Sequence, residues 1–242
     1  MQIVYFREGN YLTIVEVSNV TKYYDKNKIL DNLTLRIPEN RVVGLLGSNG
    51  AGKTTLLKII AGITQYSKGL VKVCGKEHKA QLDKIGYIPE TIDLYPYFTG
   101  REFLEFVAGL REIEARKVKS IIEKYKNILQ LPNLEELIET YSKGNKEKIL
   151  FISSIIHNPK LLVLDEPFTG IDPLIMKALK IWIKDYIRNG GSIILSTHIL
   201  ERAADLCDSI IIINNGSILD RYENISKNYI EIEDKYVSII KE

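Results

Sequence analysis

A glycine-rich run from Gly47 to Thr54 has the residue types and spacing of a phosphate-binding loop, G-x-x-x-x-G-K-[ST]. Glycines let backbone N–H groups close around a crowded negative charge, and the N-terminus of a following helix adds partial positive charge. We expect Lys53 to reach the β- and γ-phosphates of a nucleotide, and the Thr54 hydroxyl to bind Mg²⁺. The alternative is a glycine turn beside a surface lysine. The candidate phosphate-binding residues are Gly47, Ser48, Asn49, Gly50, Ala51, Gly52, Lys53, Thr54 and Thr55.

The residues on either side predict the elements that must position this run. Val42–Leu46 is a short apolar run typical of a buried strand, and Thr55–Ala61 has helical apolar spacing with Gly62 as a C-cap. A strand, a glycine loop and a helix in this order are the context in which the motif binds phosphate. The flanks therefore favour a nucleotide site.

A second apolar run, Lys160–Leu164, ends in the acidic pair Asp165 and Glu166. Ligands of α/β proteins bind at the C-terminal ends of parallel strands, where we expect this pair to lie. Asp165 fits a Walker B carboxylate that holds Mg²⁺, and Glu166 could polarise an attacking water as a general base. The alternative is a strand that ends in two solvated acids. Together with the phosphate loop, the pair favours an ATPase.

Two further patterns are ambiguous when each is taken alone. His198 follows a strand-like run, Ser192–Ser196, where an imidazole could contact a γ-phosphate and orient water. For a lone histidine, an ordinary strand–helix turn is the better interpretation. The run Tyr141–Asn145 (YSKGN) precedes a helical stretch at Lys146–Ile156, and alone it indicates only a helix N-cap.

Strand-like and helix-like segments alternate along the chain, which predicts an α/β fold with a parallel sheet. Charged segments of helical period replace strands from Gly100 to near Thr140, so we expect a helical insert at about residues 98–155. The tail, Tyr229–Ile240, has two short alternating runs, and we expect a small hairpin in a C-terminal extension, 221–242. Other strands are expected at Thr13–Val17, Lys28–Ile37, Lys68–Val73 and Ile85–Ile88, and other helices at Arg101–Leu110, Glu114–Leu129 and Leu174–Ile187.

The composition excludes several classes of function. The chain has 33 Lys and Arg against 31 Asp and Glu, a balance that gives no dedicated nucleic-acid or polybasic membrane surface. Cys74 and Cys207 have no metal-ligand spacing and suit core thiols in a reducing cytosol. Residues 1–10 lack a signal-peptide core. Aliphatic runs such as Ile210–Ile213 are far shorter than the roughly 18 to 20 residues that span a bilayer, so we expect a chain that does not cross a membrane by itself.

Over about residues 13–220 the order of these motifs resembles the nucleotide-binding subunit of ATP-binding cassette (ABC) transporters. The resemblance implies one ABC ATPase domain over residues 1–220. Its fold would be α/β, with a P-loop NTPase (RecA-like) core, an antiparallel β subdomain and an inserted α-helical subdomain. It also implies that Tyr24 stacks on adenine, although Tyr23 is an alternative and either tyrosine could instead be an ordinary strand aromatic. The matching motifs are a Walker A at Gly47–Thr54, a signature-like Tyr141–Asn145, a Walker B at Leu161–Glu166, a D-loop-like Thr169–Asp172 and a switch at His198.

The resemblance further implies that two chains, expected to be a homodimer, join head to tail around two ATP molecules with Mg²⁺. Each site would pair the Walker motifs of one chain with Ser142 and Gly144 of the other, and Asp172 is a further nucleotide-site candidate. Lys53, Glu166 and His198 would be the catalytic residues. Opening and closing would drive a separate membrane-spanning permease, which would hold the chain on the cytoplasmic side, at the inner face of the cell membrane.

Three positions depart from the family pattern. Lys143 replaces a glycine of the signature, and Thr169–Gly170 stands where the D-loop often has Ser-Ala. Glu90 replaces the Q-loop glutamine; its carboxylate can still accept a hydrogen bond from water near Mg²⁺, so Glu90 joins Thr54 and Asp165 as a candidate metal residue. Together with the run Asp165–Pro173, these features are similar to ABC-2 type export ATPases, which act in efflux.

The join of core and insert, from Glu90 to about Phe106, would form the groove that docks the permease. Tyr95, Tyr97 and Phe98 supply an aromatic patch there, although burial under the insert is an alternative. A soluble ABC ATPase of translation or DNA repair is the competing function, but the double cassette or the long insertions of such proteins are absent from the sequence. A nucleotide sensor that does not hydrolyse ATP would lack Glu166 or His198, and both are present.

Overall fold

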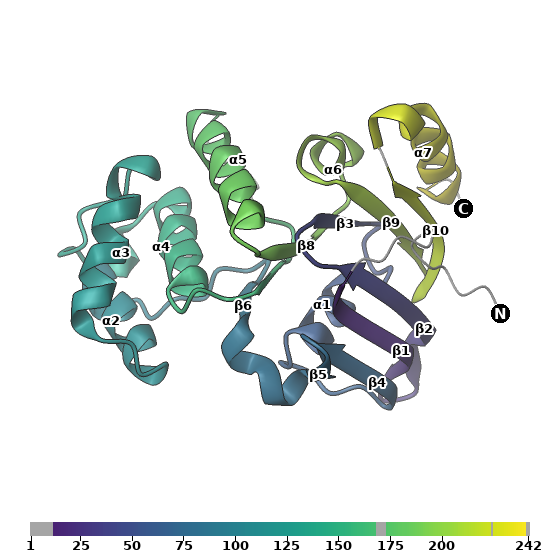
Figure 1. Ribbon diagram of the computed structural model, residues 1–242, viewed down its shortest axis with the longest axis horizontal. Helices are drawn as coiled ribbons and strands as arrows, with labels where there is room; N and C mark the ends of the chain where they lie inside the picture. The colour runs from purple at the N-terminus through teal and green to yellow at the C-terminus, as the bar shows by residue number, and fades with distance from the viewer. Residues whose placement is uncertain (1–11, 168–172, 224, 241–242) are drawn as a thin grey trace.

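The computed structural model describes residues 12–167, 173–223 and 225–240. Its strands form a six-stranded sheet in the order β10-β9-β3-β8-β7-β6 and a four-stranded antiparallel sheet in the order β2-β1-β4-β5 (Figure 1). The first comprises β3 (Val42–Leu46), β6 (Ile85–Ile88), β7 (Leu161–Leu164), β8 (Ser192–Thr197), β9 (Ser209–Asn214) and β10 (Ser217–Glu223). The second comprises β1 (Thr13–Tyr24), β2 (Asn27–Pro38), β4 (Lys68–Val73) and β5 (Lys76–Glu77).

Five strands of the larger sheet, β6, β7, β8, β3 and β9, run parallel, and β10 pairs antiparallel with β9. Their uniform apolar sequences follow from burial on both faces. In β7, Leu161 and Val163 face one apolar cluster, whereas Leu162 and Leu164 face another. The predicted α/β fold is confirmed.

Helices cover both faces of this sheet. Helix α1 (Lys53–Ile60) lies between the two sheets, and its Leu56, Leu57 and Ile60 are fully buried against strands of both. The opposite face is covered by α5 (Pro173–Arg188), α6 (Leu200–Leu206) and α7 (Ile225–Ile240) (Figure 1). Because the parallel strands end at one edge, the loops after β3, β7 and β8 meet there.

Between β6 and β7 the chain forms a helical lobe, at the left of Figure 1. It contains α2 (Gly100–Leu110), α3 (Ala115–Ile128), α4 (Lys143–Ile155) and a short 3₁₀ helix at Ile138–Thr140. Another short 3₁₀ helix, His78–Lys84, comes before β6. A capping box between Thr99 and Glu102 starts α2. Trp182 of α5 joins the lobe to the sheet, because its Nε1 donates to the Tyr125 hydroxyl at 2.7 Å and its ring meets Phe151 edge-on.

The predicted C-terminal hairpin is wrong, because α7 is a single helix. Ile225, Ile232, Tyr236 and Ile239 are buried at helical spacing, against β9, β10 and α6. Ile230, which contributed to the alternation of apolar and polar residues that predicted a strand, is 74% exposed. The alternation therefore arose from one buried and one exposed isoleucine on two sides of a helix. The predicted boundary at residue 220 falls inside β10.

Strand β1 is longer than predicted. It continues past Val17 to Tyr24, with a register shift around Asn19, whose φ is 52°. The shift breaks the alternation on which the shorter prediction depended. Among the described residues, every helix is too short or too polar to span a bilayer.

Candidate nucleotide site

The loop after β3 has a backbone that only glycine adopts without strain at two of its positions. Gly50 has φ +81°, and Gly52, the N-cap of α1, has φ +102°. A Cβ at Gly47 would collide with the Ile213 carbonyl of β9. The loop therefore turns tightly and directs the N-terminus of α1 toward the open side.

Lys53 lies inside this loop, with its side chain 6% exposed. Its Nζ donates to the carbonyl oxygens of Gly47 at 2.8 Å and Ser48 at 3.1 Å, and lies 3.7 Å from Oε1 of Glu166. Burial lowers the pKa of Lys53, while the carboxylates of Glu166 and Asp165 oppose that shift. The ammonium thus lies beside the first turn of α1, where we expect the phosphates of a nucleotide to bind.

Asp165, at the end of β7, is almost fully buried in a polar cage. Its Oδ1 accepts from the hydroxyls of Ser196 at 2.7 Å and Thr54 at 3.1 Å. The Ser196 hydroxyl also accepts from the backbone N–H of Glu166 at 2.9 Å. Ser196 therefore fixes both acids, a role that the sequence reasoning missed. Its position at the end of β8, next to β7, was the signal that could have predicted this contact.

Thr54 and Asp165, two of the three predicted Mg²⁺ ligands, are in contact. Oδ2 of Asp165 is buried and has no hydrogen-bond partner among the described residues, an arrangement that fits the binding of a cation. Hard oxygen donors are what Mg²⁺ prefers. Within the described part of the chain, no group of three or more His, Cys, Asp and Glu side chains could hold a metal ion by itself. The remaining ligands would thus come from phosphate oxygens and water.

Glu166 is the next residue, and its backbone is in the left-handed region, with φ 45°. This uncommon conformation aims the side chain away from the Asp165 cage. Oε1 of Glu166 lies 2.9 Å from Nδ1 of His198, so the Nδ1–H tautomer donates to the carboxylate. The Glu166 side chain is 9% exposed and that of His198 is 47% exposed. The structure thus brings together His198, Glu166 and Lys53.

A pocket of about 380 Å³ opens over Lys53 and Glu166. Tyr24 stands at its rim, 43% exposed, with the Lys22 ammonium 4.5 Å from the centre of its ring. Tyr23 is absent from the lining, which favours Tyr24 as the aromatic at this site. Glu90 lines the pocket as well, from the loop after β6. The full lining is Tyr24, Ile29, Asn49, Gly50, Gly52, Lys53, Thr54, Thr55, Glu90 and Glu166.

Ser142 and Gly144 are absent from this lining. Ser142 is the N-cap of α4, where its hydroxyl accepts from the backbone N–H of Asn145 at 3.3 Å. A Cβ placed on Gly144 would meet nothing within 4 Å, so this end of α4 faces open space. The chain by itself does not bring these two residues to the phosphate loop. Asp172 lies outside the described residues.

Comparison with known proteins agrees with this fold. The model of the ABC transporter family matches residues 30–169. An uncharacterised ABC transporter ATP-binding protein of Methanocaldococcus jannaschii is 38% identical over 94% of this chain and 86% of its own length. The ABC-type transporter ATP-binding protein EcsA of Bacillus subtilis is 31% identical over 96% of this chain and 98% of its own length.

A solved structure of an ATP-binding subunit of an ABC transporter superposes with a TM-score of 0.86 at 28% identity. The match covers 94% of this chain and all of that one. The chain belongs to the ABC transporter family. Within it, the chain is an ATP-binding subunit with an ABC ATPase domain.

Proposed function

We propose that the chain powers an export permease by binding and hydrolysing ATP between two copies of itself. One observation carries this proposal: Glu166 lines the pocket beside Lys53 and is in contact with both Lys53 and His198, while Ser142 and Gly144 do not reach the pocket. The first group has the chemistry for hydrolysis. The second needs another chain to contribute.

Binding of ATP would use the loop and the rim of the pocket. Backbone N–H groups of residues 47–55 and the positive end of α1 would hold the phosphates, and Lys53 would leave its two carbonyl acceptors for the β- and γ-phosphates. Tyr24, already at the rim, would stack on adenine. The attraction between the Lys53 ammonium and the phosphates would be strong, because the ammonium is buried and water screens its charge little.

Mg²⁺ would be held by the Thr54 hydroxyl and Oδ2 of Asp165. When bound, it would neutralise charge on the phosphate oxygens. Glu90, which is exposed in the same pocket, is the candidate to hold a water near the ion. Ser196 would keep Asp165 turned toward this position through its 2.7 Å hydrogen bond.

Hydrolysis would use Glu166 as the base. The carboxylate would accept a proton from water as the water oxygen bonds to the γ-phosphorus and the bond to the β–γ bridging oxygen breaks. His198 would hold this carboxylate through Nδ1 and orient the water at the γ-phosphate. Because Glu166 is 9% exposed, little bulk water competes for it.

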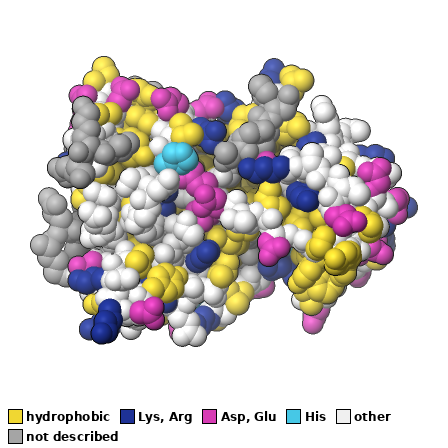
Figure 2. All heavy atoms as spheres, turned by 180° about the vertical axis from the view of Figure 1, so that it is seen from behind, with side chains coloured by type: hydrophobic (Ala, Val, Ile, Leu, Met, Phe, Trp, Pro, Cys, Tyr) yellow, Lys and Arg dark blue, Asp and Glu magenta, His cyan; other side chains and the backbone are white. Residues whose placement is uncertain are grey.

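Coupling to a permease would use the helical lobe. Tyr95 and Tyr97 are 56% and 80% exposed, and the rings of Tyr95, Phe98 and Phe106 pack together. Apolar side chains also gather over the helical lobe, at the right of Figure 2. An exposed aromatic patch of this kind is typical of a protein interface. The permease would hold the chain at the cytoplasmic face of the membrane, and the family resemblance of residues 165–173 favours export.

The substitution Glu166→Gln tests the hydrolytic assignment. Gln keeps the shape of the side chain but cannot take the proton, so we expect ATP binding to persist and turnover to fall by roughly 10²–10⁴-fold. Phosphate release and nucleotide titration on the purified chain measure the two effects. Glu201→Gln, an exposed change on α6, is the matched control and should turn over ATP normally. Native turnover by Glu166→Gln would refute the role of the base.

A further inference from the structure

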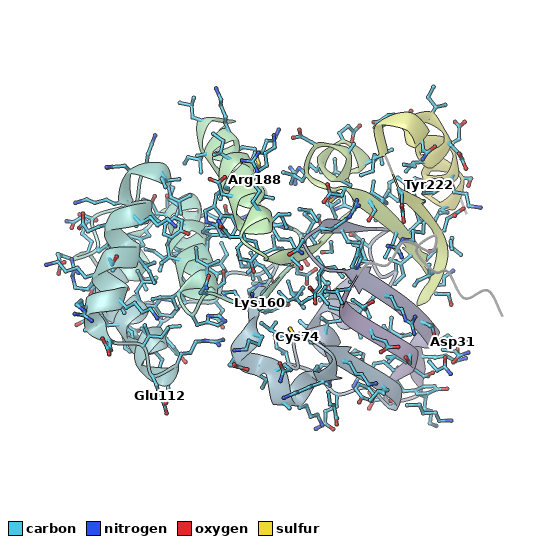
Figure 3. The ribbon with its side chains drawn as sticks, viewed as in Figure 1. Asp31, Cys74, Glu112, Lys160, Arg188 and Tyr222 are labelled. Atoms are coloured by element: carbon cyan, nitrogen blue, oxygen red, sulfur yellow. The ribbon has the colours of Figure 1, made fainter. Side chains whose placement is uncertain are left out.

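The C-terminal helix α7 packs close to the candidate catalytic site. Its buried face lies against Leu200 and Ala203 of α6 and against Ile210 and Ile212 of β9. Helix α6 begins two residues after His198. Tyr222 of β10 belongs to the same apolar cluster and lies beside α7 in Figure 3. A change in the packing of α7 can therefore alter the conformation of the loop that carries His198.

A polar contact joins this apolar interface to the turn that carries His198. Tyr236 of α7 is 6% exposed, and its hydroxyl donates to the main-chain carbonyl of His198 at 2.8 Å. A buried tyrosine needs a partner for its O–H, and here the partner belongs to the turn between β8 and α6. Burial, with a smaller contribution from the charge of Glu166, raises the pKa of Tyr236 to about 12, so the phenol keeps its proton at neutral pH.

His198 is thus held from two directions. Its carbonyl accepts from Tyr236, and its Nδ1 lies 2.9 Å from Oε1 of Glu166. The His198 side chain is half exposed, so the packing around its own ring constrains it little. Fixing the main chain at this residue fixes the point from which the imidazole reaches the carboxylate.

We propose that Tyr236 is a positioning residue for ATP hydrolysis, through which α7 holds His198 against Glu166. This inference rests on the proposed roles of Glu166 and His198. The pocket is lined from residues 24–55, 90 and 166, and not from α7. The contact should therefore affect the chemical step and leave ATP binding unchanged. Any partner that lifts α7 would lower turnover in the same way.

The test is Tyr236→Phe in the full chain, which removes one oxygen and keeps the ring. We expect kcat to fall roughly three- to tenfold, as for the loss of one neutral hydrogen bond, with KM for ATP unchanged. Tyr222→Phe is the matched control. It loses a hydroxyl from the same cluster, where that hydroxyl contacts Asp220 at 3.2 Å and also Glu231 of α7. It should keep the native kcat because, among the described residues, this hydroxyl makes no hydrogen bond to His198.

Two further measurements separate positioning from simple loss of stability. In a His198→Ala background, Tyr236→Phe should cause no additional loss of kcat, because the group it positions is absent. In the native background, Tyr236→Phe should shift the imidazole ¹⁵N resonances of His198, one of three histidines in the chain, and Tyr222→Phe should not.

The outcomes distinguish this inference from the function on which it rests. Native kcat in Tyr236→Phe, or an equal loss in the two backgrounds, would overturn the inference while the roles of Glu166 and His198 stand. Unchanged kcat in His198→Ala alone would contradict the proposed role of His198, and the inference with it. If Tyr236→Phe folds poorly, unshifted His198 resonances in its folded fraction would also overturn the inference.

Discussion

At the scale of single residues, two adjacent acids are given different surroundings. Asp165 points into a cage made by Ser196 and Thr54, and its buried Oδ2 has no hydrogen-bond partner in the part of the chain that the structure describes. Glu166, with φ 45°, points toward Lys53 and His198. Alternate residues at the end of a strand face opposite ways, and the left-handed backbone increases this divergence. One carboxylate is thereby available for a cation and the other for a proton.

The substitution Thr54→Val tests the cation site. Valine has the same shape but lacks the hydroxyl, so the gain in ATP affinity on adding Mg²⁺ should shrink by roughly tenfold or more, since a bond to a charged group contributes about 1.5–3 kcal/mol. Affinity measured with a chelator should not change. Fluorescent-nucleotide titration with and without Mg²⁺ measures both. Thr55→Val, one residue along the same pocket, should keep the native Mg²⁺ dependence; equal dependence in Thr54→Val would argue against this ligand.

At the scale of elements, buried strands support the site, and helix α7 packs behind the turn that carries His198. Strands β3, β7 and β8 are buried along their whole length and carry the phosphate loop, the acid pair and His198 at one edge of the sheet. Helix α7 packs against the sheet through one face only. The stability of the α7 packing should therefore depend on the apolar residues of that face. The exposed apolar residues of α7, which look the same in the sequence, should contribute little.

The pair Ile232→Ala and Ile230→Ala tests this packing within one helix. Ile232 is fully buried, so its truncation should lower the free energy of unfolding by about 2–5 kcal/mol. Ile230 is 74% exposed, so its truncation should change it by no more than about 0.5 kcal/mol. Urea denaturation of the two variants provides the comparison. Equal losses from both would mean that α7 is not docked through this face.

Sequence reasoning succeeded where a single signal sufficed. The bounds of β3, β4 and β6 match their predicted ranges, and β7 begins one residue after the start of its predicted run, since each is a short run bounded by turn residues. It failed where two signals competed. Ile230 and Ile232 imitate a strand inside α7, and the shift at Asn19 hides the second half of β1. Ser196 resembled any strand serine, because its two partners, the Asp165 carboxylate and the backbone N–H of Glu166, come from the end of another strand.

At the scale of the whole molecule, the β-rich core and the helical lobe carry different parts of the proposed machine. The phosphate loop and the acids belong to the core, whereas Ser142 and the aromatic patch around Tyr95 belong to the lobe. A pocket of about 530 Å³ lies between them and shares Glu90 and Glu166 with the nucleotide site. Changes at the bound nucleotide can thus be transmitted to the lobe that would contact the permease.

The substitution Tyr97→Asp tests the docking surface. Tyr97 is 80% exposed, so a charge there should leave folding and the turnover of the isolated chain unchanged but weaken an apolar interface. Tagged chain would be recovered from detergent extracts of its own cell's membranes, with mass spectrometry of any multi-span membrane protein retained. Ile230→Asp, also exposed but on α7 at the far end of the molecule, should retain that protein (Figure 1). Full retention by Tyr97→Asp would place the permease elsewhere.

The central claim is that ATP closes two copies of this chain around a shared site, and light scattering of the Glu166→Gln chain with Mg²⁺-ATP tests it most directly. The account predicts twice the monomer mass of 27.6 kDa, and a return to the monomer when Ser142→Arg is added while ATP still binds. Ser120→Arg, on the exposed side of α3, should leave the dimer intact. A monomer at saturating ATP, or a dimer that persists with Ser142→Arg, would contradict it.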